Sequence, residues 1–402
     1  MEAEERFFLA LGRLSPYLQV AHLNPYTKSM RFPLLAAPLA ISVLVISATF
    51  AVNSAAQFEG PARHDPPVRA LDLALPTENE AILADDAAAY YMWLIRHFDR
   101  DRVRTHEGGM YGYVRNARRT PAGWSFSRFH EGVDIAPVRR DARGEPLDEI
   151  RTVDDGAVVY VNNNPSSSAY GRYVVVEHWW SNSPFYTLYA HLNRVSVREG
   201  QFVTRGDELG VMGYTGTGLN RERAHLHFEV GMMLNRNFEA WFSRNVRSAN
   251  HHGRFNGLNL RGMDPMGFLM ASFMDSELTG PQFVRQQPED ITVAVPGGPT
   301  PEMLQRYPWL CGTCQPTGHE GIPARAPSWE IGLTRSGVPV RIDPIYEHVS
   351  SPTLVRVSPE MRRLHLFSRI VENNRGSWAL SGGGRNQLAI MFTTAEGGVP
   401  NW

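Results

Sequence analysis

A short stretch near the middle of the chain alternates strictly between polar and apolar side chains. His225, His227 and Glu229 occupy every second position of residues 224–230, and Leu, Phe and Val stand between and after them. Alternate side chains of an extended strand emerge on opposite faces, so the two histidines and the glutamate share one face. Imidazoles on a strand whose other face packs inward need a bonding partner, because an unsatisfied buried polar group is costly. The pattern therefore predicts a β-strand that carries a metal site or a hydrogen-bond network.

Similar β-rich runs recur from residue 111 to residue 268 and are separated by turn signals such as Asp155-Gly156. Of the 402 residues, 43% are hydrophobic and 20% are charged, which excludes a disordered or coiled-coil chain. The formal net charge of −1 argues against a nucleic-acid partner, because nucleic-acid binders are typically basic. We therefore expect a mainly β protein built on antiparallel sheet. These patterns leave the oligomeric state open.

The segment 32–52 is long and uncharged, and Leu, Ile, Val and Ala dominate it. Ser54 and Ala56 at its end satisfy the small-x-small rule for signal-peptide cleavage. We favour cleavage there, with Met30 as the initiator. The alternative is an uncleaved membrane anchor, because a segment of this length can span a bilayer core of about 30 Å. Either route predicts that the protein is exported. Its destination would be the periplasm or cell envelope, where it could be anchored to the inner membrane, or it would be secreted.

Composition and periodicity divide the chain into five parts. Residues 1–56 are expected to be an extension with the signal peptide or anchor, and residues 57–110 a linker and a helical segment, with a helix over 78–99. Residues 111–275 are expected to form the β-rich domain. Residues 276–325 are expected to be a Pro/Gly-rich linker with a Cys-x-x-Cys pair, and residues 326–402 a small C-terminal β appendage.

The cysteine pair lies in this expected linker. Cys311 and Cys314 are the two cysteines of the chain, and an exported protein meets an oxidising environment. We favour a local disulfide. The alternatives are half of a metal site with His319 and a redox pair.

Further histidines lie ahead of the alternating stretch. His130 and Asp134 are four residues apart around Gly132, so both side chains lie on one face of an extended segment. His191 shares a strand face with Tyr189. Two histidines and one aspartate suit Zn²⁺ and leave a fourth tetrahedral position for water. Such an open set is typical of catalytic zinc, and neighbouring histidines can take a proton and stabilise an oxyanion.

Taken in order, these motifs closely resemble those of the lysostaphin-type (LytM-like) zinc metallopeptidases. The resemblance covers residues 111–270. It is carried by His130-x-x-x-Asp134, Tyr189-Ala-His191-Leu, Gly213-Tyr-Thr-Gly216 and His225-Leu-His227-Phe-Glu. Shorter matches are Asp155-Gly156, the glycine-bounded stretch 200–213 and Asp264-Pro265.

The resemblance implies a fold, a site and an activity. The fold would be an antiparallel β-sheet domain with an open groove walled by loops. The zinc ligands would be His130, Asp134 and His227, with His225 as general base and His191 as the second catalytic histidine. The activity would be that of an exported zinc metalloendopeptidase cleaving peptide cross-links in peptidoglycan. The alternative is a non-catalytic LytM-like regulator that binds and activates cell-wall amidases, although such proteins typically lose zinc ligands.

Two charged insertions depart from the family pattern. Residues 138–149 and residues 219–224 are each longer than the usual connection. We expect both insertions to border the groove. The cross-link that is cleaved therefore does not carry over from the family.

Overall fold

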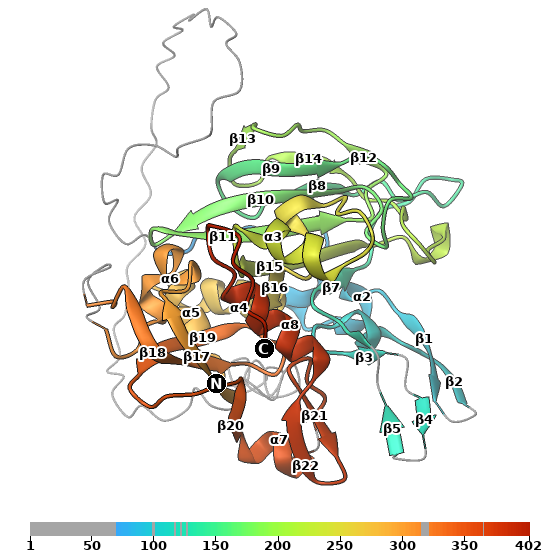
Figure 1. Cartoon of the computed structure of the whole chain (residues 1–402). Helices are drawn as coiled ribbons and strands as arrows, with labels where there is room; N and C mark the ends of the chain where they lie inside the picture. Colours follow the sequence, from blue (N-terminus) through green and yellow to red (C-terminus); the bar gives the residue numbers. More distant parts are fainter. Residues whose placement is uncertain are drawn as a thin grey trace, which may run out of the picture. The chain divides into compact units, whose positions relative to one another are not determined.

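The largest sheet of the molecule is antiparallel and carries the alternating stretch. A computed structural model describes residues 70–98, 101–115, 118–120, 123–125, 128–314, 321–364 and 366–402. The strand order is β13-β9-β10-β11-β15-β16, and β7 also pairs with β15 (Figure 1). These strands are β7 (Val133–Ile135), β9 (Gly156–Asn162), β10 (Tyr173–Trp180), β11 (Ser183–Ala190), β13 (Phe202–Val203), β15 (Leu226–Met233) and β16 (Leu260–Met263). The prediction of a mainly β protein built on antiparallel sheet is confirmed.

Both faces of this sheet are covered, so every residue of β11 and β15 is buried. Helix α4 (Pro265–Met274) covers one face, where Phe268 packs against Trp180 with ring centroids 5.1 Å apart. The opposite face holds His227 in register with Ala190 of β11. An apolar cluster continues from that point along the same face, formed by Tyr173, Val175, Tyr186, Leu188, Ala190, Met233 and Leu260. The histidines therefore stand at one end of a buried apolar surface.

A smaller sheet and several short helical segments surround the main sheet. The strand order of the smaller sheet is β12-β14-β8. Its strands are β8 (Glu149–Arg151), β12 (Arg194–Val195) and β14 (Glu208–Val211). The helical segments are η4 (Arg221–Arg223), α3 (Phe238–Asn245) and η5 (Gly253–Phe255).

The helix predicted over residues 78–99 is wrong in its second half. The segment forms η2 (Ala81–Ala84), α2 (Ala87–Tyr90) and then strand β1 (Leu94–Phe98), which pairs with β2 (Asp101–Thr105). The chain leaves the helix after Tyr90 because the next residues add an edge to β7. The Met92 amide donates to the Asp134 carbonyl oxygen at 2.8 Å, and the Ala136 amide donates to that of Tyr90 at 2.8 Å. An apolar run that fits a helix face is thus used as extended backbone.

Short elements follow β2 before the main sheet begins. They are η3 (His106–Gly109), β3 (Val114–Arg115), β4 (Arg118–Thr120), β5 (Gly123–Ser125) and β6 (Arg128–Phe129). Strand β3 pairs with β6, and β4 pairs with β5. Strand β6 ends at Phe129, so His130 follows the β3–β6 pair directly.

Within the linker predicted over residues 276–325, the described residues 276–314 and 321–325 instead belong largely to ordered helices and strands. It contains α5 (Gly280–Gln286), α6 (Met303–Arg306), η6 (Pro308–Leu310) and β17 (Ile291–Pro299). Strand β17 is internal to a four-stranded sheet of order β19-β18-β17-β20, with β18 (Arg325–Leu333), β19 (Pro339–Ile345) and β20 (Thr353–Val357). The side chains of Ile291, Val293 and Val295 are fully buried, and the proline and glycine residues come only after them. The boundary expected between 325 and 326 therefore falls inside one sheet.

The C-terminal region is β-rich as expected, but it is not a separate appendage. After β20 it forms α7 (Pro359–Leu364), β21 (Val371–Asn374), β22 (Ser377–Leu380) and α8 (Gly382–Met391). The Asn235 side-chain amide donates to the carbonyl oxygens of Ile390 and Thr393 at 2.8 and 2.7 Å. Asn235 follows β15, so the end of the chain is hydrogen-bonded to the segment next to the histidine strand.

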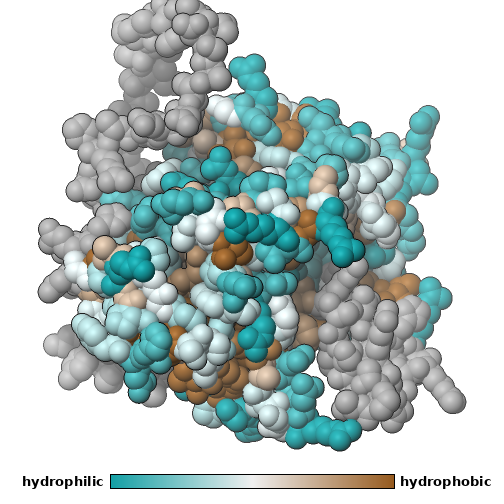
Figure 2. All heavy atoms as spheres, viewed as in Figure 1, coloured by the Kyte–Doolittle hydropathy of each residue, from teal (hydrophilic) through white to brown (hydrophobic). Residues whose placement is uncertain are grey.

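The favoured disulfide between Cys311 and Cys314 is present. The apolar segment 32–52 lies outside the described residues, and among those that are described no helix is long and apolar enough to cross a membrane. The face of the molecule in Figure 2 is covered largely by hydrophilic and neutral side chains.

Candidate metal centre

Pairing of β7 with β15 brings the first three predicted site residues together. Asp134 of β7 lies directly opposite His227 of β15 in the register of the two strands. His130 precedes β7 and reaches the same point because the chain turns at Gly132. A side chain at Gly132 would have its Cβ 2.6 Å from the Phe228 carbonyl oxygen and 2.9 Å from the His227 ring. Glycine is needed here because the backbone passes so close to β15.

The three side chains converge on one oxygen atom. Asp134 Oδ1 lies 3.0 Å from His130 Nε2 and 2.9 Å from His227 Nδ1, and these two nitrogens are 3.3 Å apart. All three residues are less than 10% exposed. Among the residues that the structure describes, this is the one group of three or more His, Cys, Asp or Glu whose donor atoms lie within 4.8 Å of one another.

The outer nitrogen of each of these two imidazoles has its own acceptor. His130 Nδ1 lies 2.9 Å from the carbonyl oxygen of Met110, which can only accept, so Nδ1 carries the hydrogen. His227 Nε2 lies 2.8 Å from Glu229 Oε1 and donates to that carboxylate. The inward nitrogens are therefore Nε2 of His130 and Nδ1 of His227. Orientation by an outer partner in this way is typical of metal-ligating histidines.

Behind His227, Glu229 is itself fixed. The Tyr170 hydroxyl donates to Glu229 Oε1 at 2.6 Å, and the Tyr170 and His227 rings are 5.5 Å apart. The carboxylate therefore accepts two hydrogen bonds on one oxygen while it is 5% exposed. Burial and the Glu229 charge raise the pKa of Tyr170 well above its usual value, which keeps the hydroxyl a donor.

The other two predicted residues, His191 and His225, lie beside this group. His225 Nδ1 donates to the Arg223 carbonyl oxygen at 2.7 Å, and its Nε2 lies 3.4 Å from Asp134 Oδ1. His191 follows β11 in a left-handed conformation (φ 66°), and its Nδ1 donates to the Thr215 carbonyl oxygen at 2.8 Å. The ring centroids of His191 and His225 are 4.7 Å apart. The structure thus brings all five predicted site residues into one cluster.

Burial and the charges of neighbouring side chains shift the pKa values of the residues in this cluster. Burial alone would raise the pKa of Asp134, but the charges and hydrogen bonds of His130 and His225 hold it well below its usual range. Burial also lowers the pKa of His191 well below 6.5, and the neighbouring His225 and His227 lower it further. Burial opposes the charge on His227, yet hydrogen bonds to Asp134 and Glu229 raise its pKa to about 10.

The donor set fits a zinc ion. Two imidazole nitrogens and one carboxylate oxygen are the ligand types that Zn²⁺ takes in catalytic sites, and a fourth position stays open for water or substrate. The donors converge although they are buried, and the outer partners Met110 and Glu229 already hold the rings in the orientation that ligation needs.

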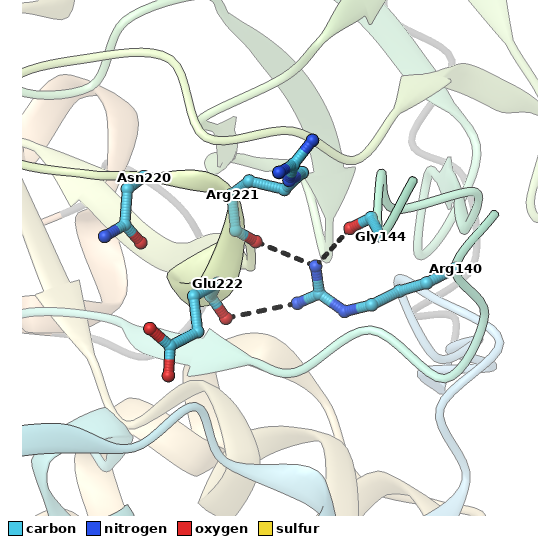
Figure 3. A pocket seen from close by; sticks show the side chains of 5 residues that line it. All are labelled: Arg140, Gly144, Asn220, Arg221 and Glu222. Carbon is cyan, nitrogen blue, oxygen red and sulfur yellow. Dashed lines mark hydrogen bonds between the residues drawn. The ribbon is translucent and has the colours of Figure 1, made fainter. Parts of the chain in front are cut away.

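Arg140 joins the two charged insertions to each other (Figure 3). Its Nη1 donates to the main-chain oxygens of Gly144 and Arg221 at 2.8 and 2.7 Å, and its Nη2 donates to that of Glu222 at 3.3 Å. These residues and Asn220 line a cavity of about 470 Å³. Because residues 219–224 also supply the carbonyl oxygen that holds His225, Arg140 connects both insertions to a predicted catalytic side chain.

Sequence reasoning missed several partners of the five residues. Glu229 was placed on the same strand face as His227, but its position behind the ring was not predicted. Tyr170 and the carbonyl acceptors of Met110 and Thr215 were not predicted either. Alternation in β15 could have identified Glu229, whereas every residue has a carbonyl group and no residue type marks those acceptors.

Comparison with known proteins locates the family within the chain. Residues 128–237 match the model of Peptidase family M23. Peptidoglycan DD-endopeptidase ShyB of Vibrio cholerae is 38% identical over 114 residues, which are 28% of this chain and 22% of ShyB. Murein hydrolase activator NlpD of Escherichia coli is 35% identical over 101 residues, which are 25% of this chain and 22% of NlpD.

These alignments cover about a fifth of the length of each curated relative. A solved structure of a zinc-containing peptidase from Vibrio cholerae is 32% identical over 30% of this chain and 33% of that chain, with a TM-score of 0.21. The resemblance to LytM-like peptidases found in the sequence is thus confirmed for the domain that holds the histidine cluster.

Proposed function

We propose that the protein is a zinc metalloendopeptidase acting on peptide cross-links in peptidoglycan, because residues 128–237 match the model of Peptidase family M23. The observation that carries this proposal is the convergence of five side chains. His130 and His227 approach one oxygen of Asp134, and His191 and His225 stand beside them. The name of the relative ShyB, a peptidoglycan DD-endopeptidase, supports this class of substrate.

The proposed roles follow from the atoms that face inward. His130 Nε2, His227 Nδ1 and a carboxylate oxygen of Asp134 would hold the ion. Zinc, when bound, supplies a Lewis acid that makes water a better nucleophile and polarises a substrate carbonyl. Glu229 holds the His227 ring through Nε2, and the Met110 carbonyl oxygen holds His130 through Nδ1.

His225 and His191 would handle the proton. Each donates Nδ1–H to a carbonyl oxygen, so in the neutral imidazole Nε2 carries the lone pair. His225 Nε2 can accept a proton from the attacking water and return it to the leaving amine. His191, whose ring centroid lies 4.7 Å from that of His225, can accept a hydrogen bond from the same water through Nε2 and so orient it.

The similarity to a murein hydrolase activator supports a second candidate function, that of a regulator. NlpD is a murein hydrolase activator, and its likeness to this chain favours a regulator that binds cell-wall amidases. The retention of all five side chains in one buried cluster supports the enzyme instead, because a regulator does not need them. Both functions place the protein outside the cytoplasm, so we propose the periplasm or cell envelope as its location, with residues 32–52 as signal peptide or anchor.

The test separates the two functions in one experiment. The purified chain is analysed for zinc and incubated with peptidoglycan sacculi, alone and together with a cell-wall amidase, and the soluble products are separated by mass. We expect about one zinc per chain and cleaved cross-link peptides without the amidase. His130→Ala should abolish both, and the control His251→Ala, at an exposed histidine, should abolish neither.

Two results would contradict the enzyme. One is cleavage that persists in His130→Ala. The other is a wild-type chain that releases nothing alone but accelerates the amidase, which would favour the regulator.

A further inference from the structure

The C-terminal region reaches the metal centre through an ion pair at the loop that carries His130. Glu131, the next residue, lies with its Oε2 3.1 Å from Nη1 of Arg369. The loop between two candidate ligands is thus held by a residue from the last part of the chain.

A second link lies one strand further along the sheet. Arg261 of β16 is buried, and its Nε donates to Gln387 Oε1 at 2.6 Å. Gln387, on α8, is 1% exposed and donates its own Nε2–H to the Gly337 carbonyl oxygen at 2.6 Å. Both the oxygen and the nitrogen of the Gln387 side-chain amide are therefore hydrogen-bonded, and this amide fixes the position of the Arg261 guanidinium.

The two links converge on the same piece of backbone. Gly262, next to Arg261, is paired with Gly231 of β15, and a Cβ at Gly262 would overlap the Glu131 carbonyl oxygen. The loop at Glu131 therefore lies directly on β16, beside the strand that carries His227. Burial and the charge of Arg369 lower the pKa of Arg261 to about 9, although the charge of Glu131 opposes this. The charges of the two links thus interact.

Arg369 and Gln387 also belong to one locally bonded unit. Ser381, the N-cap of α8, accepts from the Gly384 amide at 2.9 Å and donates its hydroxyl to the Arg369 carbonyl oxygen at 2.8 Å. The backbone that presents Arg369 is therefore attached to the helix that presents Gln387. A displacement of this unit would move both contacts at once.

We propose that Arg369 and Gln387 are positioning residues for the metal centre. Arg369 acts through its ion pair with Glu131, and Gln387 acts through its hydrogen bond with Arg261. Together these contacts hold the 130–132 loop against β15 and β16, and so keep His130 at the separation from His227 that a shared ion requires. This inference rests on the proposed zinc site and deepens it: the last part of the chain becomes part of the machinery that binds the metal. Neither residue belongs to the group of candidate ligands.

The experiment measures zinc affinity in the full chain, by competition with a chromophoric chelator, together with the visible spectrum of the cobalt-substituted protein. We expect Arg369→Gln and Gln387→Leu to weaken zinc binding by about 10- to 100-fold, the usual effect of losing an outer partner of a metal site. Matched controls are Arg385→Gln and Asn386→Leu, at exposed positions of the same helix α8, which should bind zinc as the wild type does.

Three further readouts separate positioning from mere structural support. The unfolding midpoint of the zinc-free chain should change little in Arg369→Gln, and Arg369→Lys should restore much of the affinity. The double variant Glu131→Gln, Arg369→Gln should bind zinc no more weakly than Arg369→Gln alone, because both changes remove one interaction.

Wild-type zinc affinity in Arg369→Gln and Gln387→Leu would overturn the inference. A loss of affinity matched by an equal loss of stability in the zinc-free chain would also overturn it, because the residues would then only support the fold. A chain that binds zinc but cleaves nothing would refute the proposed activity and leave this inference standing. Zinc binding that persists in His130→Ala would overturn both.

Discussion

Replacing Glu229 by glutamine would remove one negative charge from behind His227 while keeping the size of the side chain. Glu229 Oε1 accepts from His227 Nε2 at 2.8 Å and from the Tyr170 hydroxyl at 2.6 Å, and the side chain is buried. A glutamine oxygen can still accept both hydrogens, so the ring should keep its place. What is lost is the charge that strengthens the bond and makes the imidazole a better metal ligand.

The magnitude follows from the number of charged bonds. A hydrogen bond to a charged group contributes about 1.5–3 kcal/mol, roughly twice the contribution of a neutral one. Converting the His227 bond from charged to neutral should therefore cost about 1–2 kcal/mol of metal-binding free energy. At 1.4 kcal/mol per factor of ten, zinc affinity should fall by about 5- to 30-fold. Glu229→Ala, which also removes the acceptor, should lose more.

The assay is competition for zinc with a chromophoric chelator at pH 7, with circular dichroism to confirm that each variant is folded. Glu177→Gln is the matched control. Glu177 lies on β10, and its Oε2 accepts from the Tyr186 hydroxyl at 2.7 Å, so the chemistry is similar but β11 separates it from β15. Its zinc affinity should be unchanged. If Glu229→Gln and Glu229→Ala both bind zinc within twofold of the wild type, His227 does not depend on its outer partner and the reasoning is refuted.

Three further changes test other parts of the structure. Gly132→Ala brings a methyl group 2.6 Å from the Phe228 carbonyl oxygen, and urea unfolding should show a loss of about 1–3 kcal/mol; an unchanged midpoint would contradict the close approach. Arg140→Ala loses three hydrogen bonds to main-chain oxygens, so limited proteolysis should cut residues 138–149 and 219–224 faster, and equal rates would refute their connection. Burial would raise the pKa of Glu289, but hydrogen bonds from Arg341 and other partners lower it from 4.5 to about 2. Its contribution to stability is therefore complete above about pH 4.5 and is lost as the pH falls towards 2. Glu289→Gln should flatten that part of the stability curve, and an unchanged slope would contradict the assignment.

Sequence predicts the fold well where a short pattern of polar and apolar residues is compatible with only one type of secondary structure. Strict alternation in residues 224–230 predicts an extended strand with His225 and His227 on one face; β15 (Leu226–Met233) forms that strand from residue 226 onward, and His225 lies directly before it. The spacing of His130 and Asp134 predicts one face of an extended segment, but β7 begins only at Val133, and His130 reaches Asp134 because the backbone bends at Gly132. That these groups meet depends on the pairing of β7 with β15, which no local pattern encodes; the family resemblance implied the shared ligand set but not this pairing.

The errors arise where local composition and tertiary context disagree. Tyr90 to Trp93 are apolar enough for a helix face, but pairing with residues 134–136 is a long-range interaction and it decides the conformation. Residues 295–301 have the composition of a linker, yet the four residues directly before them, 291–294, are all buried and place β17 inside a sheet. The Glu131–Arg369 ion pair joins two ordinary charged residues that are distant in sequence, so neither one stands out before the fold is known.

The three carbonyl oxygens that orient His130, His191 and His225 belong to the main chain, at Met110, Thr215 and Arg223. Any amino acid offers the same oxygen, so the side chains at these three positions are free to vary without loss of the acceptor. Loop length is a different matter, because one inserted or deleted residue would carry the oxygen away from the ring. The hydrogen bonds that orient the histidines therefore tolerate substitution of the acceptor residues but do not tolerate a change in loop length. This favours diversification of the groove by point mutation over remodelling of the loops next to the ligands.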